Sequence, residues 1–573
     1  MPPFGPGRSS FIVRRWSPVV RRWSLVVRHW PFILLLLLTA CAPATITANT
    51  PSATPTAGTP RPVATPTPTP LPAVSPAATP SPTPTAVPAE GGILRLGLVG
   101  KPGSLNPLAE DTPAMDRLTP LLYDSLWQVD PQTAALRPGL AQGWEYSADG
   151  LSLTFHLPPG LRWSSGEPLT ALQLVNSLQA SEHPTLRAFS QITAPDPRTL
   201  TLTFARIDCA AATAIGLLPL VHPDTLEAAV PVGSGPFVAE GWAGPDRTLT
   251  LHRNPYYRGP GPRLDGVSVR FLSADEVAVA ATEAAFDVLG PLPAGETPTA
   301  SPALQRLAYP SGQMVYIALN YAPKNEPPLP PEVRRALTLA LDRPAVLSDT
   351  LAGEGQLLAG PLLPGHWAAV DSLTPPDYNP AAARDLLAQA GLRDTDGDGW
   401  LDQNGKRFEL SIRLNAENPL HQKLGWLVSS YYRDLGLYAR AEGVPAESLV
   451  DDLFTHDFQA AVFAWPARPD PDQRAFWLST QAEAGAGLNL VSFQDAQVDD
   501  LLAQAVAVPG CQPETRAGLY ARLQKILAQA RPVDFLLAPN HTLLVSNRVR
   551  GLSPGPFAPF TWNIGDWGVE IGD

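Results

Sequence analysis

The chain has few cysteines, few charged residues and none of the short motifs that mark several common enzyme classes. Only three cysteines occur among 573 residues, and 16% of the residues are charged. No HExxH metalloprotease motif is present, and the nine histidines are scattered. Gly233-Ser234-Gly235 lacks the spacing of a nucleophile elbow, and Gly100-Lys101 is followed by proline, which excludes a phosphate-binding loop. The sequence therefore predicts a protein that is not an enzyme and that uses no cofactor.

Positive charge is scarce beyond the N-terminus. The formal net charge is −12, but residues 1–40 contain six arginines and no acidic residue. The rest of the chain is therefore near −18. Such a charge is unfavourable for binding nucleic acid or an anionic lipid surface, so we expect no nucleic-acid partner.

Residues 1–40 have the pattern of an export signal. Arginines precede an apolar run over residues 32–38, which is too short for a permanent membrane helix. The string Leu38-Thr39-Ala40-Cys41 resembles a bacterial lipobox. This resemblance implies that residues 1–40 are a lipoprotein signal peptide and that Cys41 carries the lipid. An uncleaved anchor is the alternative, and the repeated upstream pattern leaves the start codon open.

A low-complexity segment follows. Between residues 42 and 89 there are 14 prolines and 12 threonines, and Arg61 is the only charged residue. Such a composition cannot bury a core and favours an extended polyproline II chain. We interpret residues 41–89 as the lipidated cysteine and a disordered Pro/Thr linker that lifts the folded part off the membrane.

Cys209 and Cys511 remain after Cys41 is assigned to lipidation. They could pair outside the cell, but the sequence does not show whether they approach each other. We expect two unpaired thiols, because the domain assignment below places the two residues in different lobes.

Strand and helix patterns interleave after residue 90. Residues 93–98, 151–157 and 200–204 alternate as strands, whereas 333–341, 498–505 and 519–527 have helical spacing. This order predicts the α/β class.

Several ordered blocks resemble family 5 of the bacterial extracellular solute-binding proteins, the dipeptide, oligopeptide and nickel group. They include VGSGPFVAEGW at 232–242 and LHRNPYYRG at 251–259. The other blocks lie at 91–108, 121–171, 315–321, 331–346, 378–410 and 489–502. The resemblance implies a two-lobed periplasmic-binding-protein-like fold, type II, of the large cluster with an extra small domain.

Family practice also implies the domain boundaries. Lobe one would comprise 90–127, 206–319 and 536–573, the small domain 128–205, and lobe two 320–535. Chain crossings near 312–322 and 535–542 would form the hinge on which the lobes close around a ligand.

The resemblance suggests ligand-binding residues in both lobes. In peptide-binding relatives a Trp-x-x-Asp element grips the ligand ammonium, and the aligned residues here are Trp465 to Arg468. Trp465 predicts an aromatic wall or, alternatively, a core residue. Tyr316 and Asn320 align with the lobe crossing, and Asn489 either bonds ligand or holds a loop. Asp470 is a further candidate for ligand binding in lobe two, and the candidates in lobe one are Glu110, Asp111 and Thr112.

Arginine at position 468 reverses the charge expected for an ammonium partner. Its planar guanidinium could bind a carboxylate or phosphate, or it could pair with nearby Asp470 or Asp472. The sequence favours the local pair because of its proximity, and it leaves the anion clamp open. We therefore expect the ligand to bear an acidic or neutral polar group here.

One acidic loop resembles the start of a calcium-binding EF-hand. Asp394, Asp396, Asp398 and Asp402 occupy ligand positions, but Gly405 replaces the bidentate glutamate. We interpret the segment as an Asp/Gly-rich hairpin turn, with a weak calcium site as the alternative, and predict no other metal site.

These observations predict a monomeric lipoprotein on the outer face of the cytoplasmic membrane. It would capture a peptide-like or other small polar solute and deliver it to ABC permease subunits powered by cytoplasmic ATPases. A receptor for a membrane signalling protein is the alternative, and a stalked hydrolase is disfavoured by the missing motifs.

Overall fold

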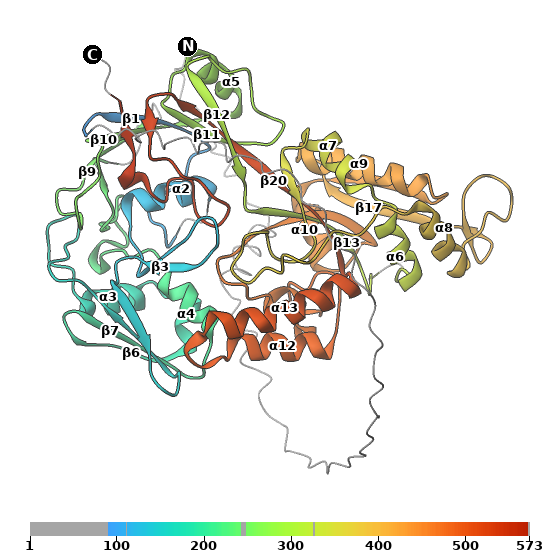
Figure 1. Ribbon diagram of the computed structural model, residues 1–573, viewed down its shortest axis with the longest axis horizontal. Coiled ribbons are helices and arrows are strands. Elements are labelled where there is room, and N and C mark those ends of the chain that lie inside the picture. Colours follow the sequence, from blue (N-terminus) through green and yellow to red (C-terminus); the bar gives the residue numbers. More distant parts are fainter. Residues whose placement is uncertain (1–89, 110–111, 242–247, 325–326, 571–573) are drawn as a thin grey trace, which may run out of the picture. The chain divides into compact units, whose positions relative to one another are not determined.

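The computed structural model describes residues 90–109, 112–241, 248–324 and 327–570 (Figure 1). The predicted signal peptide, Cys41 and the linker lie outside these ranges, as do Glu110 and Asp111. Within the described ranges, no helix combines the length and apolarity needed to cross a membrane. Strands and helices interleave along the chain, which confirms the predicted α/β class.

The largest sheet in the described residues has twelve strands. They are β1 (Ile93–Val99), β8 (Phe237–Ala239), β9 (Thr248–Arg253), β10 (Gly266–Leu272), β11 (Val288–Pro293), β12 (Leu304–Pro310), β13 (Gln313–Leu319), β14 (Gly355–Leu357), β17 (Glu409–Asn415), β18 (Tyr438–Val444), β19 (Ala460–Pro466) and β20 (Val533–Ser546). The order is β18-β17-β19-β13-β20-β11-β1-β10-β9-β8, and both β12 and β14 pair with β20 beside this path. β1 is parallel to its two neighbours, which is consistent with crossover connections rather than hairpins.

The alternation in the sequence explains β1. Leu94, Leu96 and Leu98 are fully buried, whereas Ile93 and Arg95 are exposed. Successive side chains of a strand point to opposite faces, so this pattern buries one face of β1. The predicted strand over residues 93–98 is confirmed.

A separate four-stranded sheet lies within the segment predicted as the small domain. Its strands are β4 (Gly143–Tyr146), β5 (Ser152–His156), β6 (Phe189–Asp196) and β7 (Thr199–Phe204), in the antiparallel order β4-β5-β7-β6. Phe155 and Leu200 pair across β5 and β7 and are fully buried. The hairpin of β2 (Trp127–Val129) and β3 (Leu136–Pro138) precedes this sheet.

The described residues contain twelve α-helices. They are α2 (Pro113–Leu122), α3 (Ala171–Ala180), α4 (Cys209–Gly216), α5 (Ala274–Glu283), α6 (Pro331–Leu339), α7 (Arg343–Leu351), α8 (Pro380–Gln389), α9 (Pro419–Arg433), α10 (Ala446–Phe454), α11 (Arg474–Trp477), α12 (Ala496–Val506) and α13 (Pro513–Ala530). The three helical patterns predicted from the sequence fall on α6, α12 and α13. Proline at the first position of α6 costs no hydrogen bond, because that N–H has no partner within a helix.

One long strand, β20, lies inside the large sheet and joins its two halves. Its first half pairs with β13 and β14, and its second half pairs with β11 and β12. Leu537 and Leu543 are both fully buried, but they pack into different hydrophobic clusters. The predicted crossings near 312–322 and 535–542 fall on β13 and β20, and their role as a hinge stays a prediction.

A buried ion pair joins α7 to β20. The side chains of Arg343 and Asp534 are 1% and 3% exposed, and the guanidinium donates to the carboxylate. Arg343 also donates to the carbonyl oxygens of Thr338 and Pro376, each at 3.1 Å. Desolvation raises the pKa of Asp534, and the positive charge of Arg343 opposes that rise.

The two cysteines outside the N-terminal region form a disulfide, so the prediction of unpaired thiols is wrong. Cys209 is the first residue of α4, and Cys511 lies in the turn between α12 and α13. Their Cα atoms are 5.4 Å apart although 302 positions separate them in sequence. The prediction failed because the assignment to different lobes was taken to keep the two residues apart, whereas α4 contacts α12.

Candidate functional site

A small apolar pocket lies beside the end of β19. Its walls include Tyr316 of β13, Trp465 of β19, and Phe476 and Trp477 of α11. Its volume is about 30 Å³, enough for one or two water molecules or a small apolar group. Arg468 lies at its edge, so the pocket brings together three residues predicted to bind ligand.

A much larger cavity adjoins this pocket. Its volume is about 1640 Å³, which exceeds the range of volumes typical of pockets that bind drug-sized ligands. Its walls include residues 107–109, Leu217 at the end of α4, and the segment 557–566. Arg468 and Pro469 line it as well, so Arg468 borders both spaces. The arrangement suits an extended solute whose polar group meets the arginine.

Arg468 has no ion-pair partner among the described residues. Its side chain is exposed, and its guanidinium carbon lies 5.6 Å from the centre of the Phe476 ring, within range of a cation–π interaction. Desolvation by the surrounding walls lowers the pKa of Arg468, and the charge of Asp472 opposes this. The guanidinium remains positively charged at neutral pH and can accept an anionic group.

The local pairing that the sequence favoured for Arg468 is not formed. Both carboxylate oxygens of Asp470 bind Arg516, at 2.8 and 2.9 Å, and one also accepts a hydrogen bond from Thr213. Burial alone would raise the pKa of Asp470, but the charge of Arg516 lowers it overall. The carboxylate of Asp470, itself a predicted ligand-binding residue, is therefore already occupied.

Asp472 is also engaged elsewhere. Arg474 donates to both of its oxygens and forms two further bonds to Asp208, at 2.9 and 3.0 Å. Charge on the segment 470–474 is thus neutralised by residues other than Arg468. The sequence interpretation failed here because nearness along the chain does not fix where side chains point.

Two aromatic side chains hold the backbone next to Arg468. His366 Nε2 lies 3.1 Å from the carbonyl oxygen of Pro469, and Trp367 Nε1 donates to the same oxygen at 3.4 Å. His366 Nδ1 accepts from the N–H of Ala368, so Nε2 carries the proton and donates. Desolvation lowers the pKa of His366 to about 4, which keeps this tautomer neutral at pH 7. The bonds preorganise the segment that carries the arginine.

The two predicted asparagines are fully buried and bonded to backbone. Asn320 donates to the carbonyl oxygens of His456 and Phe458, and Asn489 donates to those of Leu478 and Phe493. For Asn489 this geometry corresponds to the loop-holding alternative. Neither side chain lines the two spaces described above, so we do not include them in the proposed site.

Thr112 serves as the N-cap of α2. Its side-chain oxygen accepts a hydrogen bond from the N–H of Met115 at 3.3 Å. It follows the loop 107–109 that lines the large cavity, but Thr112 itself is not among the lining residues. Its predicted ligand contact stays a prediction.

The wall of the large cavity contains an ion pair that was not predicted from the sequence. Arg258 donates to Asp124 at 3.2 Å, and Ser234 donates to the other carboxylate oxygen at 3.1 Å. Desolvation raises the pKa of Asp124, and Arg258 opposes the rise. Both residues lie in blocks that resemble the family, but the opposite charges stand 134 positions apart and gave no local signal.

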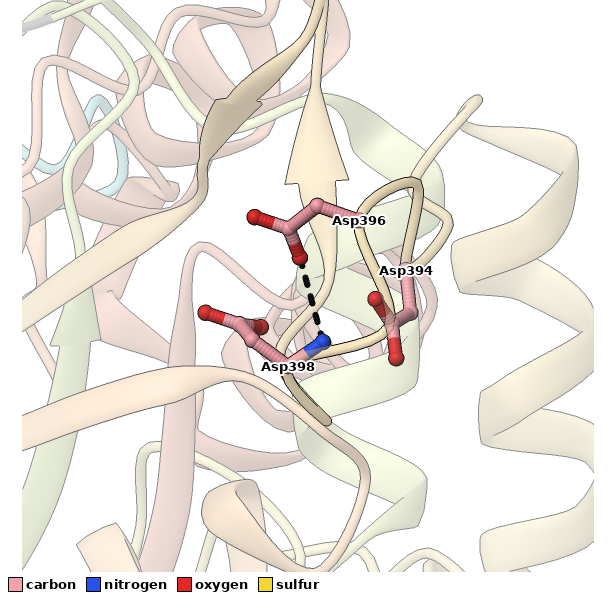
Figure 2. Close-up of side chains that lie close together, drawn as sticks. All are labelled: Asp394, Asp396 and Asp398. Carbon is pink, nitrogen blue, oxygen red and sulfur yellow. Dashed lines mark hydrogen bonds between the residues drawn. The ribbon is translucent and has the colours of Figure 1, made fainter.

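The acidic loop before β15 (Asp402–Gln403) and β16 (Lys406–Arg407) is stabilised by its own backbone. Figure 2 shows Asp394, Asp396 and Asp398 around one turn. All three are exposed, and one carboxylate oxygen of each lies within 4.8 Å of those of the other two. Asp394 accepts from the N–H groups of two loop glycines, and Asp396 accepts from that of Asp398. Arg407 pairs with Asp398, and buried Asp402 accepts two bonds from Thr395.

We expect no calcium binding by this loop at about 1 mM, a concentration that fills weak extracellular sites. The carboxylates already accept backbone hydrogen bonds, and Arg407 adds opposing charge. Isothermal titration with calcium chloride checks this. A saturable heat that disappears in Asp396→Asn would contradict the expectation.

Residues 135–486 match the model of the family described as bacterial extracellular solute-binding proteins, family 5 Middle. The chain belongs to this family. Family 5 proteins are extracytoplasmic proteins that bind a solute and work with ABC permeases. This member is a solute-binding protein of that type.

Two curated relatives of this family 5 protein illustrate the range of ligands named. Oligopeptide-binding protein AppA of Bacillus subtilis (strain 168) is 25% identical over 506 residues, covering 84% of this chain and 92% of the relative. Heme-binding protein A of Haemophilus influenzae is 25% identical over 484 residues, covering 76% and 85%. The solved structure of Bacillus subtilis AppA with a nonapeptide matches with a TM-score of 0.67 at 24% identity, covering 84% of this chain and all of that one. This structural likeness supports the periplasmic-binding-protein fold.

Proposed function

We propose that this family 5 protein captures a peptide-like solute by an acidic group, which binds Arg468, and hands the solute to an ABC permease. The observation that carries the proposal is a charged guanidinium without an ion-pair partner in the described residues, placed between an apolar pocket and a large cavity. An unpaired positive charge in partly desolvated surroundings is stabilised when an anion arrives.

The chemistry of the site favours a carboxylate or a similar planar anion. A guanidinium donates two parallel hydrogen bonds to such a group, and these are stronger than neutral ones. The adjoining pocket is small and walled by aromatic rings, so it suits a small apolar substituent next to the anion. The 1640 Å³ cavity leaves room for the rest of an extended molecule.

Two lobes would close around this solute. Lobe one comprises 90–127, 206–319 and 536–573, the small domain 128–205, and lobe two 320–535. The hydrophobic cluster around β1 supports this division, because all its buried members fall in the three lobe-one segments, and so does strand β20, which pairs with strands of both lobes. The sequence supports attachment through a lipid on Cys41.

The test compares one peptide that has a free C-terminal carboxylate with its C-terminal amide. Mass spectrometry of the solute that co-purifies with the native protein guides the choice of peptide. We expect the amide to bind about 10- to 100-fold more weakly, because hydrogen bonds to charged groups contribute roughly 1.5–3 kcal/mol. Arg468→Gln is expected to weaken binding of the acid by a similar factor and to abolish the difference between the two peptides.

Arg433→Gln is the matched control. Arg433 is an exposed arginine at the end of α9 and lines neither space, so its replacement should preserve the preference for the acid. Equal calorimetric affinities of acid and amide for the wild-type protein would refute the proposed role of Arg468.

A further inference from the structure

The Cys209–Cys511 disulfide joins two parts of the molecule that have separate hydrophobic cores. Ala212 and Ile215 of α4 pack with the four-stranded sheet, whereas Tyr520 of α13 packs in the cluster that surrounds the small apolar pocket. The disulfide therefore links elements of two different hydrophobic cores and does not lie within one of them.

Both partners of the disulfide belong to elements that border the large cavity or hold its wall. Cys209 begins α4, and Leu217 and Leu218 at the other end of this helix line the cavity. Cys511 precedes α13, which carries Arg516. Through Asp470, this arginine holds the segment that begins with Arg468. A bond between the cysteines thus ties the helix that ends in Leu217 to the segment that begins with Arg468, and both line the cavity.

Non-covalent contacts reinforce the same junction. Asp208, the N-cap of α4, binds Arg474 through two hydrogen bonds, and Thr213 one turn further donates to Asp470 at 2.9 Å. The turn that contains Cys511 also lies against the four-stranded sheet. A Cβ atom on Gly150 would approach the backbone nitrogen of Gly510 to 3.0 Å. The contact surface is therefore close-packed and charge-paired around the disulfide.

We propose that this disulfide is a latch: when oxidised it holds α4 against the segment 468–474, and when reduced it lets the two cavity walls separate. The ion pair that crosses this junction, Asp208–Arg474, is partly exposed, and such a pair contributes little once solvent reaches it. The covalent bond limits the opening of the junction in a way that this ion pair cannot.

The chemical step is a thiol–disulfide exchange. A dithiol reductant attacks one sulfur, the Cys209–Cys511 bond breaks, and two electrons and two protons pass to the protein, leaving two thiols and an oxidised cyclic disulfide. Cys511 is partly exposed whereas Cys209 is 1% exposed, so the attack is expected at Cys511. An extracytoplasmic location favours the oxidised form, so the latch is closed by default.

One consequence of the latch rests on the proposed function: the reduced protein would exchange its solute faster than the oxidised protein. Its mechanical part is tested without any solute, by hydrogen–deuterium exchange of the full-length protein before and after treatment with dithiothreitol. We expect amides of α4 and of residues 508–516 to exchange at least tenfold faster after reduction. Amides of β1 and α9, which do not contact the junction, serve as the internal reference and are expected to remain unchanged.

The double variant Cys209→Ser/Cys511→Ser keeps the test decisive. It is expected to show the fast exchange of the reduced protein at all times and to be insensitive to dithiothreitol, while circular dichroism reports an intact fold. Unchanged exchange of α4 after complete reduction, confirmed by thiol counting, would overturn the latch. That result would leave the carboxylate test of Arg468 unaffected, because the two experiments have different readouts.

Discussion

Replacing Arg343 with methionine is expected to lower the free energy of unfolding by about 3–5 kcal/mol, since it leaves the Asp534 carboxylate buried without its partner. Both side chains are almost completely buried, and the pair links α7 to the strand that joins the two halves of the large sheet. Methionine preserves much of the apolar stem, so the loss reports on the charge rather than on a cavity. Urea denaturation followed by circular dichroism measures it.

The double variant Arg343→Met/Asp534→Leu separates the cost of an orphan charge from the value of the pair. Removing both charges should restore most of the lost stability, because an apolar replacement of a buried ion pair is often close to neutral. Arg433→Met, at an exposed position, should change the free energy of unfolding by less than about 0.5 kcal/mol. A small effect of Arg343→Met alone would show that water or another residue compensates Asp534.

The second large effect is a loss of stability in mild acid. Desolvation lowers the pKa values of His366, His421 and His541 to about 4 each, from an ordinary value of 6.5. Below pH 6.5 the unfolded chain binds protons that the folded protein does not, so the free energy of unfolding falls as the pH drops from 6.5 towards 4. Each histidine contributes up to about 3 kcal/mol over this window.

The variant His421→Leu isolates one of these contributions. His421 is 8% exposed, and its Nδ1 has no hydrogen-bond partner in the part of the chain that the structure describes. Leucine should therefore reduce the slope of the free energy of unfolding between pH 4.5 and 6 by about 1.4 kcal/mol per pH unit, the equivalent of one proton. Gln422→Leu, at an exposed position of the same helix, changes no titratable group and should leave the slope unchanged. If the free energy of unfolding had the same pH slope in the wild-type protein and in His421→Leu, then His421 would bind its proton as readily in the folded protein as in the unfolded chain, which would contradict the expectation.

Local patterns in the sequence were sufficient for the elements but not for their partners. The alternation over residues 93–98 predicted β1, and the helical spacing over 333–341 predicted α6, because both periodicities depend on neighbouring residues alone. The class and the family followed from ordered blocks. Pairings between distant residues left no such local trace.

The site shows the same limit in its charges. The sequence identified Trp465, Tyr316 and Arg468, and the structure brings them together at one pocket. It could not identify Arg516 as the partner of Asp470, because 46 positions separate them and only the packing of α13 brings them into contact. The disulfide was missed for the same reason.

Strand β20 follows every other strand of the large sheet along the chain, which bears on how synthesis relates to folding. β11 and β13 both need this strand as a neighbour, and it begins only at residue 533. Until a ribosome has added residues 533–546, both β11 and β13 keep unpaired backbone groups along an interior edge. The two halves of the large sheet therefore stay incomplete during elongation until this strand has been made.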